Sequence, residues 1–325
     1  IRKFRTLPGA SQTAYWNRFG DWYGAHGQYL HALDAYRMSA NNDAALAIIE
    51  KDAGNLLSAI APEDLLSRLD ACPAEVLMRH PTALLVLMRR LFTWRQIPKM
   101  LQMKALLTRA IAESPDMTAE ERGNLLGECD LIMSFLSYND ITEMSRLHRS
   151  ASRQMTRSAV TIQAGSWTFG SPSVLMMYYR APGELQKELH EMNECMPHYY
   201  RITNGHGLGA ELVMAEASFM QGRLHEAEIG IECARTKIAG SGQENMALCC
   251  DFLQLRLRLA AGKGRLLDME SRKQSLQARH DVVLLNMLDA IYAYYYALIQ
   301  DTARIPEVFR LHRLDTVNYF APEGP

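Results

Sequence analysis

The strongest constraint on the fold is a regular spacing of aromatic and small residues near the N-terminus. In chain order these residues are Trp16, Phe19, Gly20, Tyr23, Gly27, Tyr29, Ala32 and Tyr36. Small residues such as Gly20 and Ala32 let two helices approach where they cross, and Gly27 suits the end of the first helix. Aromatic rings at the other positions fill the space between helical pairs. The spacing therefore predicts an antiparallel pair of helices.

A second stretch repeats this spacing in the C-terminal half. It comprises Met214, Ala215, Gly222, Leu224, Ala227, Ile231 and Ala234. Both copies fit the tetratricopeptide pattern, and a degraded third copy begins near Leu255 with Gly262 at its turn. We therefore expect an all-α chain of tetratricopeptide-like helical hairpins that forms an irregular right-handed superhelix, or α-solenoid. Residues 1–60 would form an N-terminal helical segment with the first unit, and residues 61–325 one continuous array.

Helical periodicity dominates the rest of the chain. One apolar face is formed by Leu84, Leu85, Leu87, Met88 and Leu91. The segment from 244 to 261 is rich in Ala and Leu and has no turn signals, so it predicts a helix although its leucines alternate. No run of β-branched residues is bounded by paired turn signals, which argues against strands.

Two helix starts are marked by their local residues. Pro62 is followed by Glu63 and Asp64, an arrangement typical of a first helical turn. Thr118 precedes Glu121 by three positions, which predicts a capping box at the start of another helix. Short loops between such helices favour antiparallel hairpins.

Composition narrows the classes of protein that are possible. The formal net charge of −1 gives no electrostatic attraction to nucleic acid or an anionic membrane. The 6 cysteines form no CxxC pair, so we expect reduced thiols in a cytoplasmic protein. No apolar run approaches the length of a transmembrane helix, and no signal-peptide pattern is present. Because the chain begins at Ile1, we expect it to be part of a longer protein.

The sequence contains no pattern that predicts catalysis. There is no phosphate-binding GxxxxGK[ST] loop, no HExxH or GxSxG motif and no dinucleotide-binding fingerprint. The 10 histidines are scattered and form no pair spaced four residues apart. We therefore expect a protein that binds and is not an enzyme, with no metal and no cofactor of its own.

One region departs from the repeat pattern by mixing aromatic rings with hydroxyls, amides, an arginine and glycines. It runs from residue 165 to 173 and continues, after an expected helix, from 197 to 207. Such a mixture suits recognition of a polar small molecule or a peptide. The candidate binding residues are Trp167, Phe169, Tyr199, Tyr200, Arg201, Asn204 and His206. The alternative is a structured connection that fills a gap in the superhelix with its aromatic rings in the core.

A second group of candidates follows on the expected helices beyond this region. It comprises Glu211, Asn245, Asp251 and Arg256. Helical-repeat proteins bind partners on their concave face, where these side chains would lie. The alternative for each is a solvated helix face or a local salt bridge.

The opening segment also resembles a protein family. The runs 22–27 (WYGAHG), 31–36 (HALDAY) and 44–50 (AALAIIE) resemble a stretch of LuxR/MalT-type bacterial transcription regulators. Segments 167–173 and 199–207 resemble a block shared by a subgroup of these regulators from anaerobic Gram-positive bacteria. In this family the stretch follows a nucleotide-binding ATPase and precedes a helix-turn-helix, and neither motif is present in this chain.

The resemblance implies a sensor region that binds a small-molecule or peptide inducer and takes part in self-association. ATP would bind only to the upstream domain, and this region would make no direct contact with DNA or a membrane. The family's best-known inducer is a maltooligosaccharide, but no sugar-binding motif matches residue by residue. The alternative is a tetratricopeptide-like scaffold that binds a peptide or a partner subunit.

Overall fold

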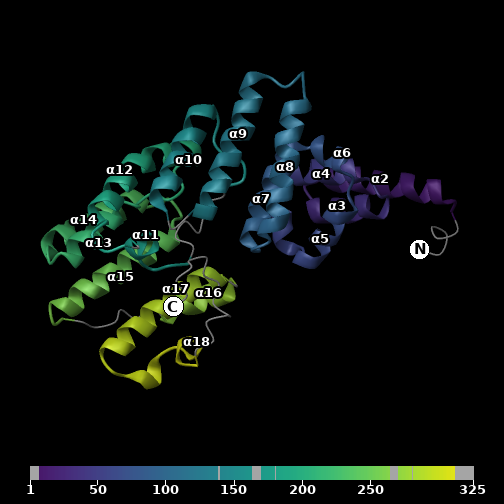
Figure 1. Cartoon of the computed structure of the whole chain (residues 1–325). Coiled ribbons are helices and arrows are strands. Elements are labelled where there is room, and N and C mark those ends of the chain that lie inside the picture. The colour runs from purple at the N-terminus through teal and green to yellow at the C-terminus, as the bar shows by residue number, and fades with distance from the viewer. Residues whose placement is uncertain are drawn as a thin grey trace. The chain divides into compact units, whose positions relative to one another are not determined.

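The computed structural model describes residues 7–137, 140–162, 170–179, 181–263, 270–279 and 281–311. Within these ranges every regular element is a helix, and no strand is present (Figure 1). The prediction of an all-α chain is therefore confirmed. The tetratricopeptide-like superhelix stays a prediction.

The chain divides into two compact units. The first contains Ile1–Ile132 and Arg153–Thr161, and the second contains Met133–Ser152 and Ile162–Pro325. Each unit is described by itself below. The boundary that the sequence predicts near residue 60 stays a prediction.

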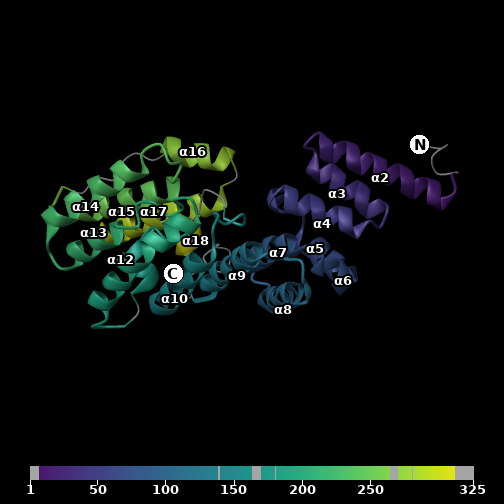
Figure 2. The ribbon, with the colours of Figure 1, turned by 90° about the horizontal axis from the view of Figure 1, so that it is seen from above.

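The first unit is built from consecutive helices. They are α2 (Gly9–Ala25), α3 (Tyr29–Met38), α4 (Asn42–Lys51), η1 (Asn55–Ala59), α5 (Pro62–Ala71), α6 (Ala74–Met78), α7 (Pro81–Thr93), α8 (Ile97–Glu113) and α9 (Ala119–Ser134). Helices α2, α3 and α4 lie side by side (Figure 2), and α7 packs against both α4 and α8. The apolar face predicted from Leu84 to Leu91 is buried in α7.

The first predicted helical pair is present as α2 and α3. Gly27 joins them with a φ of 71°, a left-handed conformation that glycine adopts without strain. Ala32 has no exposed surface, and Gly20 lies directly against the ring of Tyr36. The exception is Phe19, which is 45% exposed and therefore adds little to the core.

The predicted helix starts are also found. Helix α5 begins at Pro62 with acidic residues in its first turn. At the start of α9, the Glu121 N–H donates to the Thr118 hydroxyl at 3.1 Å, and the Thr118 N–H donates to the Glu121 carboxylate at 2.9 Å. This is the reciprocal pair of hydrogen bonds that defines a capping box.

A buried carboxylate fastens residues 155–161 to α9 within the first unit. Glu128 has no exposed surface. It accepts hydrogen bonds from the Arg157 guanidinium at 2.9 Å and from the Thr161 N–H at 2.7 Å. Asn124, one helical turn earlier, accepts from the Thr156 N–H at 2.9 Å. The bonds to the N–H groups of Thr156 and Thr161 satisfy backbone donors in a segment that lies outside the helices.

The second unit is also helical. Its elements are η2 (Phe135–Ser137), α10 (Ile141–Gln154), α11 (Val174–Tyr178), α12 (Leu185–Ile202), α13 (Leu212–Met220), α14 (Leu224–Ile238), α15 (Glu244–Ala260), α16 (Glu270–Ala278), α17 (Val282–Leu298), η3 (Thr302–Arg304) and α18 (Glu307–Arg310). Helix α14 packs between α13 and α15, and α17 packs against α15 and α16. The helix predicted over 244–261 is confirmed as α15.

The second predicted helical pair is present as α13 and α14. Ala227 and Ile231 have no exposed surface, and Gly230 of α14 lies against Ala215 of α13. Gly222 forms the turn between the helices with a φ of 78°. Met214, another position of the pattern, is 46% exposed.

One expectation about local structure is wrong. The sequence predicts that residues 197–207 follow a helix, but α12 continues through Pro197 to Ile202. Leu189, Met196 and Tyr199 are buried at helical spacing on both sides of the proline. Burial of this continuous apolar face offsets the backbone hydrogen bond that a proline inside a helix removes.

Two further features of the described residues concern membranes and thiols. No helix among them combines the length and the apolar character needed to cross a bilayer. All six cysteines are free thiols, and only Cys72 and Cys233 have substantial exposure.

Candidate functional site

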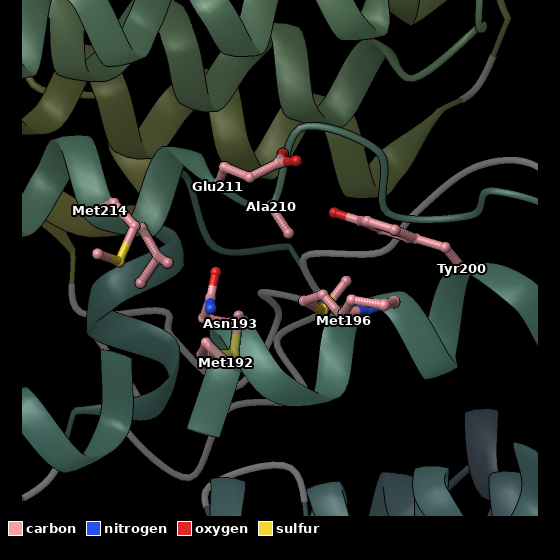
Figure 3. A pocket seen from close by; sticks show the side chains of 9 residues that line it. Met192, Asn193, Met196, Tyr200, Ala210, Glu211 and Met214 are labelled. Carbon is pink, nitrogen blue, oxygen red and sulfur yellow. The ribbon is translucent and has the colours of Figure 1, made fainter. Parts of the chain in front are cut away.

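A small pocket in the second unit lies between α12 and the residues that lead into α13 (Figure 3). Its volume is about 100 Å³. The lining residues are Met192, Asn193, Met196, Pro197, Tyr200, Ala210, Glu211, Val213 and Met214. Two of them, Tyr200 and Glu211, are among the candidate binding residues that the sequence predicts.

Helix α12 supplies one wall because its lining residues share a face. Met192, Met196 and Tyr200 follow at intervals of four residues, and Asn193 and Pro197 flank them. Pro197 has no N–H, so the carbonyl group of Asn193 lacks its usual helical donor. This wall therefore combines apolar thioethers with the amide side chain of Asn193.

Two of the residues that line this pocket each have a buried polar atom without a partner. The Tyr200 hydroxyl and the Oε2 atom of Glu211 are buried and form no hydrogen bond. The side chains point toward each other in Figure 3. Glu211 forms an ion pair with Lys237 through its other oxygen. One carboxylate oxygen is therefore held by a lysine, and the other has no hydrogen-bond partner within the protein.

The environment of Tyr200 shifts its acidity. Burial raises the pKa of the Tyr200 hydroxyl, and the negative charge of Glu211 raises it further, while the nearby Ala210 N–H, whose own hydrogen bond goes to the Gly207 carbonyl, opposes this shift. The hydroxyl is therefore protonated at neutral pH and can both donate and accept a hydrogen bond.

The size and chemistry of the pocket restrict what it can hold. Its volume is below the roughly 300–1,000 Å³ of pockets that bury drug-sized ligands. It can therefore enclose one functional group of a larger molecule. The acceptors on Glu211 and Tyr200, within a wall of methionine side chains, suit a hydrogen-bond donor such as an ammonium, amide or hydroxyl group.

Three other predicted residues are held by partners inside the second unit. Tyr199 is buried, and its hydroxyl forms a 2.7 Å hydrogen bond with Nδ1 of the buried His206. The guanidinium of Arg201 donates to the Ser152 hydroxyl at 2.7 Å and 3.0 Å. None of the three lines the pocket.

The remaining predicted residues lie elsewhere. Asn204 is exposed and has a φ of 53°, so it forms the turn after α12. Asn245 is buried, and both polar atoms of its amide lack a partner. Asp251 lies 2.7 Å from Arg235 and 2.8 Å from Arg272, as expected for a local salt bridge.

Trp167 and Phe169 lie outside the described residues. Arg256 is buried and forms an ion pair with Glu216 at 3.4 Å. The sequence pattern did not single out Glu216. The signal that could have identified Glu216 was an acidic residue on the expected buried face of a helix in the second repeat.

A buried serine and histidine also lie close together. The Ser134 hydroxyl is 2.9 Å from Nε2 of His148, and Nδ1 of His148 has no partner. Burial, together with the smaller effect of the nearby His198, lowers the pKa of His148 to about 3. A general base needs a pKa near the working pH and a group that orients it. This pair therefore does not favour nucleophilic catalysis.

The described residues contain no group of three or more His, Cys, Asp or Glu side chains that could hold a metal ion. No family model matches the chain, and no curated protein or solved structure matches it significantly.

Proposed function

We propose that the second unit binds a ligand through a hydrogen-bond donor, and that the chain is the ligand-sensing and self-association module of a LuxR/MalT-type transcription regulator. The observation that carries the binding proposal is the pair of unpartnered polar atoms on Tyr200 and Glu211, two residues of a pocket whose other lining residues are apolar except Asn193. Buried polar groups without partners are uncommon because each costs free energy. A donor group on a ligand would satisfy both.

The position of the pocket suggests how binding could be transmitted. Tyr200 lies in the last turns of α12, and Glu211 immediately precedes α13. A ligand that bonds to both would favour one packing of α12 against α13 over others. Because α13 packs against α14 and α15, that preference would extend to the neighbouring helices of the unit. Self-association that depends on ligand is the expected response in a regulator of this class.

A second candidate function is a scaffold that binds a peptide or a partner subunit. The small volume of the pocket favours it, because the pocket fits one side chain of a peptide. The exposure of Met214, Asn193 and Pro197 at its edge would leave room for the peptide backbone. A lysine or asparagine side chain has the donors that Tyr200 and Glu211 require.

The test is calorimetric titration of the whole chain with n-butylamine, acetamide and short peptides that contain lysine or asparagine. We expect at least one of these probes to bind, and Glu211→Gln and Tyr200→Phe to weaken its binding by about tenfold or more. Glu228→Gln is the matched control, because Glu228 is exposed on α14 and does not line this pocket.

The result also separates the two functions. Binding of a small probe accompanied by a change in sedimentation would support the sensor, whereas binding of peptides alone would support the scaffold. The binding proposal is wrong if none of the probes binds, or if Glu228→Gln weakens binding as much as Glu211→Gln does.

A further inference from the structure

A second, larger pocket lies in the first unit and is independent of the proposed function. Its volume is about 310 Å³, at the lower end of the range typical of small-molecule sites. It is formed by α3, α4, α5, α6 and the short connections between them. The lining residues are Leu33, Arg37, Ala40, Asn42, Ala45, Leu46, Ile49, Leu65, Arg68, Leu69, Ala71, Cys72 and Leu77.

The inner wall of this pocket is hydrocarbon. Six of the lining residues are leucines or an isoleucine that are almost completely buried. They are Leu33, Leu46, Ile49, Leu65, Leu69 and Leu77. An occupant that replaces water here must therefore present an apolar body.

Two arginines change the chemistry on one side of the pocket. The side chain of Arg37, on α3, is 55% exposed, and that of Arg68, on α5, is 30% exposed. Among the described residues, Asp34 is the only acidic residue within 4.0 Å of either guanidinium group, and its distances of 3.8 Å and 3.9 Å are too long for a hydrogen bond. One exposed carboxylate is thus shared loosely by two cations, and the N–H groups of both remain available to an anion.

Two other acidic residues of this region are already paired with cations of their own. Asp43, at the start of α4, is held by Arg79 through contacts of 2.7 Å to each carboxylate oxygen. Asp70, at the end of α5, forms an ion pair with Lys99. Each of these two carboxylates has its own cation, so neither competes with a ligand for Arg37 or Arg68.

We propose that this pocket binds a small amphiphile that has an apolar chain and an anionic oxygen head group, such as a carboxylate. The chain would lie against the buried leucines, and the head group would accept hydrogen bonds from Arg37 and Arg68 in place of Asp34. Arginine suits this role because its planar N–H groups match the two oxygens of a carboxylate. The apolar wall and the paired cations together exclude a cationic or fully polar ligand.

Cys72 provides a reporter inside the pocket. It lines the cavity and is partly exposed, whereas Cys233 lies on α14 of the second unit. Burial raises the pKa of the Cys72 thiol, so alkylation is measured at mildly alkaline pH. An occupant of the pocket should slow alkylation of Cys72 and leave Cys233 unchanged.

The experiment compares decanoate, decanol and decyltrimethylammonium on the whole chain, each below its micelle concentration. Binding is followed by calorimetry, and site occupancy by mass spectrometry of alkylated Cys72 and Cys233. We expect decanoate to bind at least about tenfold more tightly than decanol and to protect Cys72 alone. Decyltrimethylammonium should bind more weakly than decanol.

Charge variants test the two arginines separately. Arg37→Gln and Arg68→Gln should each weaken decanoate binding by about tenfold and leave decanol binding unchanged. Arg109→Gln is the matched control, because Arg109 lies on α8 and pairs with Glu113 outside the pocket. These variants are surface changes, so thermal unfolding of each should match the parent chain.

Several results would overturn the proposal. The proposal is wrong if decanoate and decanol bind equally tightly, or if decanoate still binds as tightly to both arginine variants. It is also wrong if decanoate does not slow the alkylation of Cys72. If Cys72 is alkylated more slowly at higher concentrations of the chain itself, with no probe added, a second copy of the chain occupies the pocket instead. None of these outcomes depends on Tyr200 or Glu211, so failure here is distinguishable from failure of the proposed function.

Discussion

The guanidinium of Arg256 lies 3.4 Å from the carboxylate of Glu216, with 8% and 0% of the two side chains exposed. Glu216 also accepts the Leu175 N–H at 2.6 Å, so this one carboxylate connects α11, α13 and α15. The Arg256 guanidinium lies 4.6 Å from the ring centre of Phe219 and 5.5 Å from that of Phe252. Burial raises the pKa of Glu216, while Leu175 and Arg256 oppose this shift.

Removing one member of this pair should leave a buried charge without its partner. We expect Glu216→Leu and Arg256→Met each to lower the free energy of unfolding by about 3 kcal/mol. The double variant should lose less than the sum, because it leaves no isolated charge. Urea unfolding of the four chains measures the coupling. The same double-mutant cycle on the exposed pair Glu143 and Arg146 should show almost no coupling energy. If the losses of the two single variants at the buried pair simply add in the double variant, Glu216 and Arg256 do not stabilise each other as a pair.

His148 should make stability depend on pH. Its pKa is lowered from 6.5 to about 3 by burial, so below pH 6.5 the unfolded chain binds a proton that the folded chain does not. Its contribution is therefore complete above pH 6.5 and is lost as pH falls toward 3, with a slope of at most about 1.4 kcal/mol per pH unit. Urea unfolding at several pH values should show a shallower acid slope for His148→Gln than for the parent. Equal slopes would show that His148 does not titrate in this way.

Two adjacent tyrosines should respond differently to loss of their hydroxyl groups. Tyr199→Phe removes a 2.7 Å hydrogen bond to buried His206, so we expect a loss of about 1 kcal/mol or more in the free energy of unfolding. Tyr200→Phe removes a buried hydroxyl that has no partner, so we expect no loss or a small gain. Denaturant unfolding of both variants checks this, and equal losses would mean that the Tyr200 hydroxyl has a structural partner.

The contact between α2 and α3 should not tolerate a methyl group at Gly20. A Cβ atom there would lie 2.4 Å from the ring of Tyr36, whose hydroxyl is held by Asp21 at 2.8 Å. We expect Gly20→Ala to lower the free energy of unfolding of the first unit by about 1–3 kcal/mol. Gly9→Ala is the control, because nothing lies within 4 Å of its Cβ and alanine favours helix. Thermal unfolding compares the two, and a stabilised Gly20→Ala chain would contradict the predicted close approach.

Local sequence patterns predicted the structure correctly where it depends on interactions between residues that are close in the chain. The capping box of Thr118 and Glu121 spans three residues, and the turns at Gly27 and Gly222 depend on the conformation of one glycine. Residues that contact one another within a helical hairpin, such as Gly20 and Tyr36, could also be predicted because their spacing is regular. These features led correctly to an all-helical chain and to both helical pairs.

Local patterns failed where a long-range contact outweighed a local preference. A proline usually marks the end of a helix, but α12 continues past Pro197 because Tyr199 and Ile202 beyond it are buried. The candidate site was predicted only in part for the same reason. Tyr200 was predicted from the atypical aromatic and polar stretch, and Glu211 from the expected helices beyond it, yet the methionines that form their pocket have the pattern of any buried helix face.

The amino-acid sequence by itself determined that this chain is helical, where several helices begin, and which small residues lie between paired helices, because these depend on neighbours a few positions apart. Only the tertiary structure decided which polar groups find partners. Arg256 reaches Glu216 across 40 positions and is fixed in the core, while Tyr200 and one oxygen of Glu211 meet in a pocket and remain unpaired. Pairing of this kind depends on how helices pack, and packing depends on the shape of the whole core.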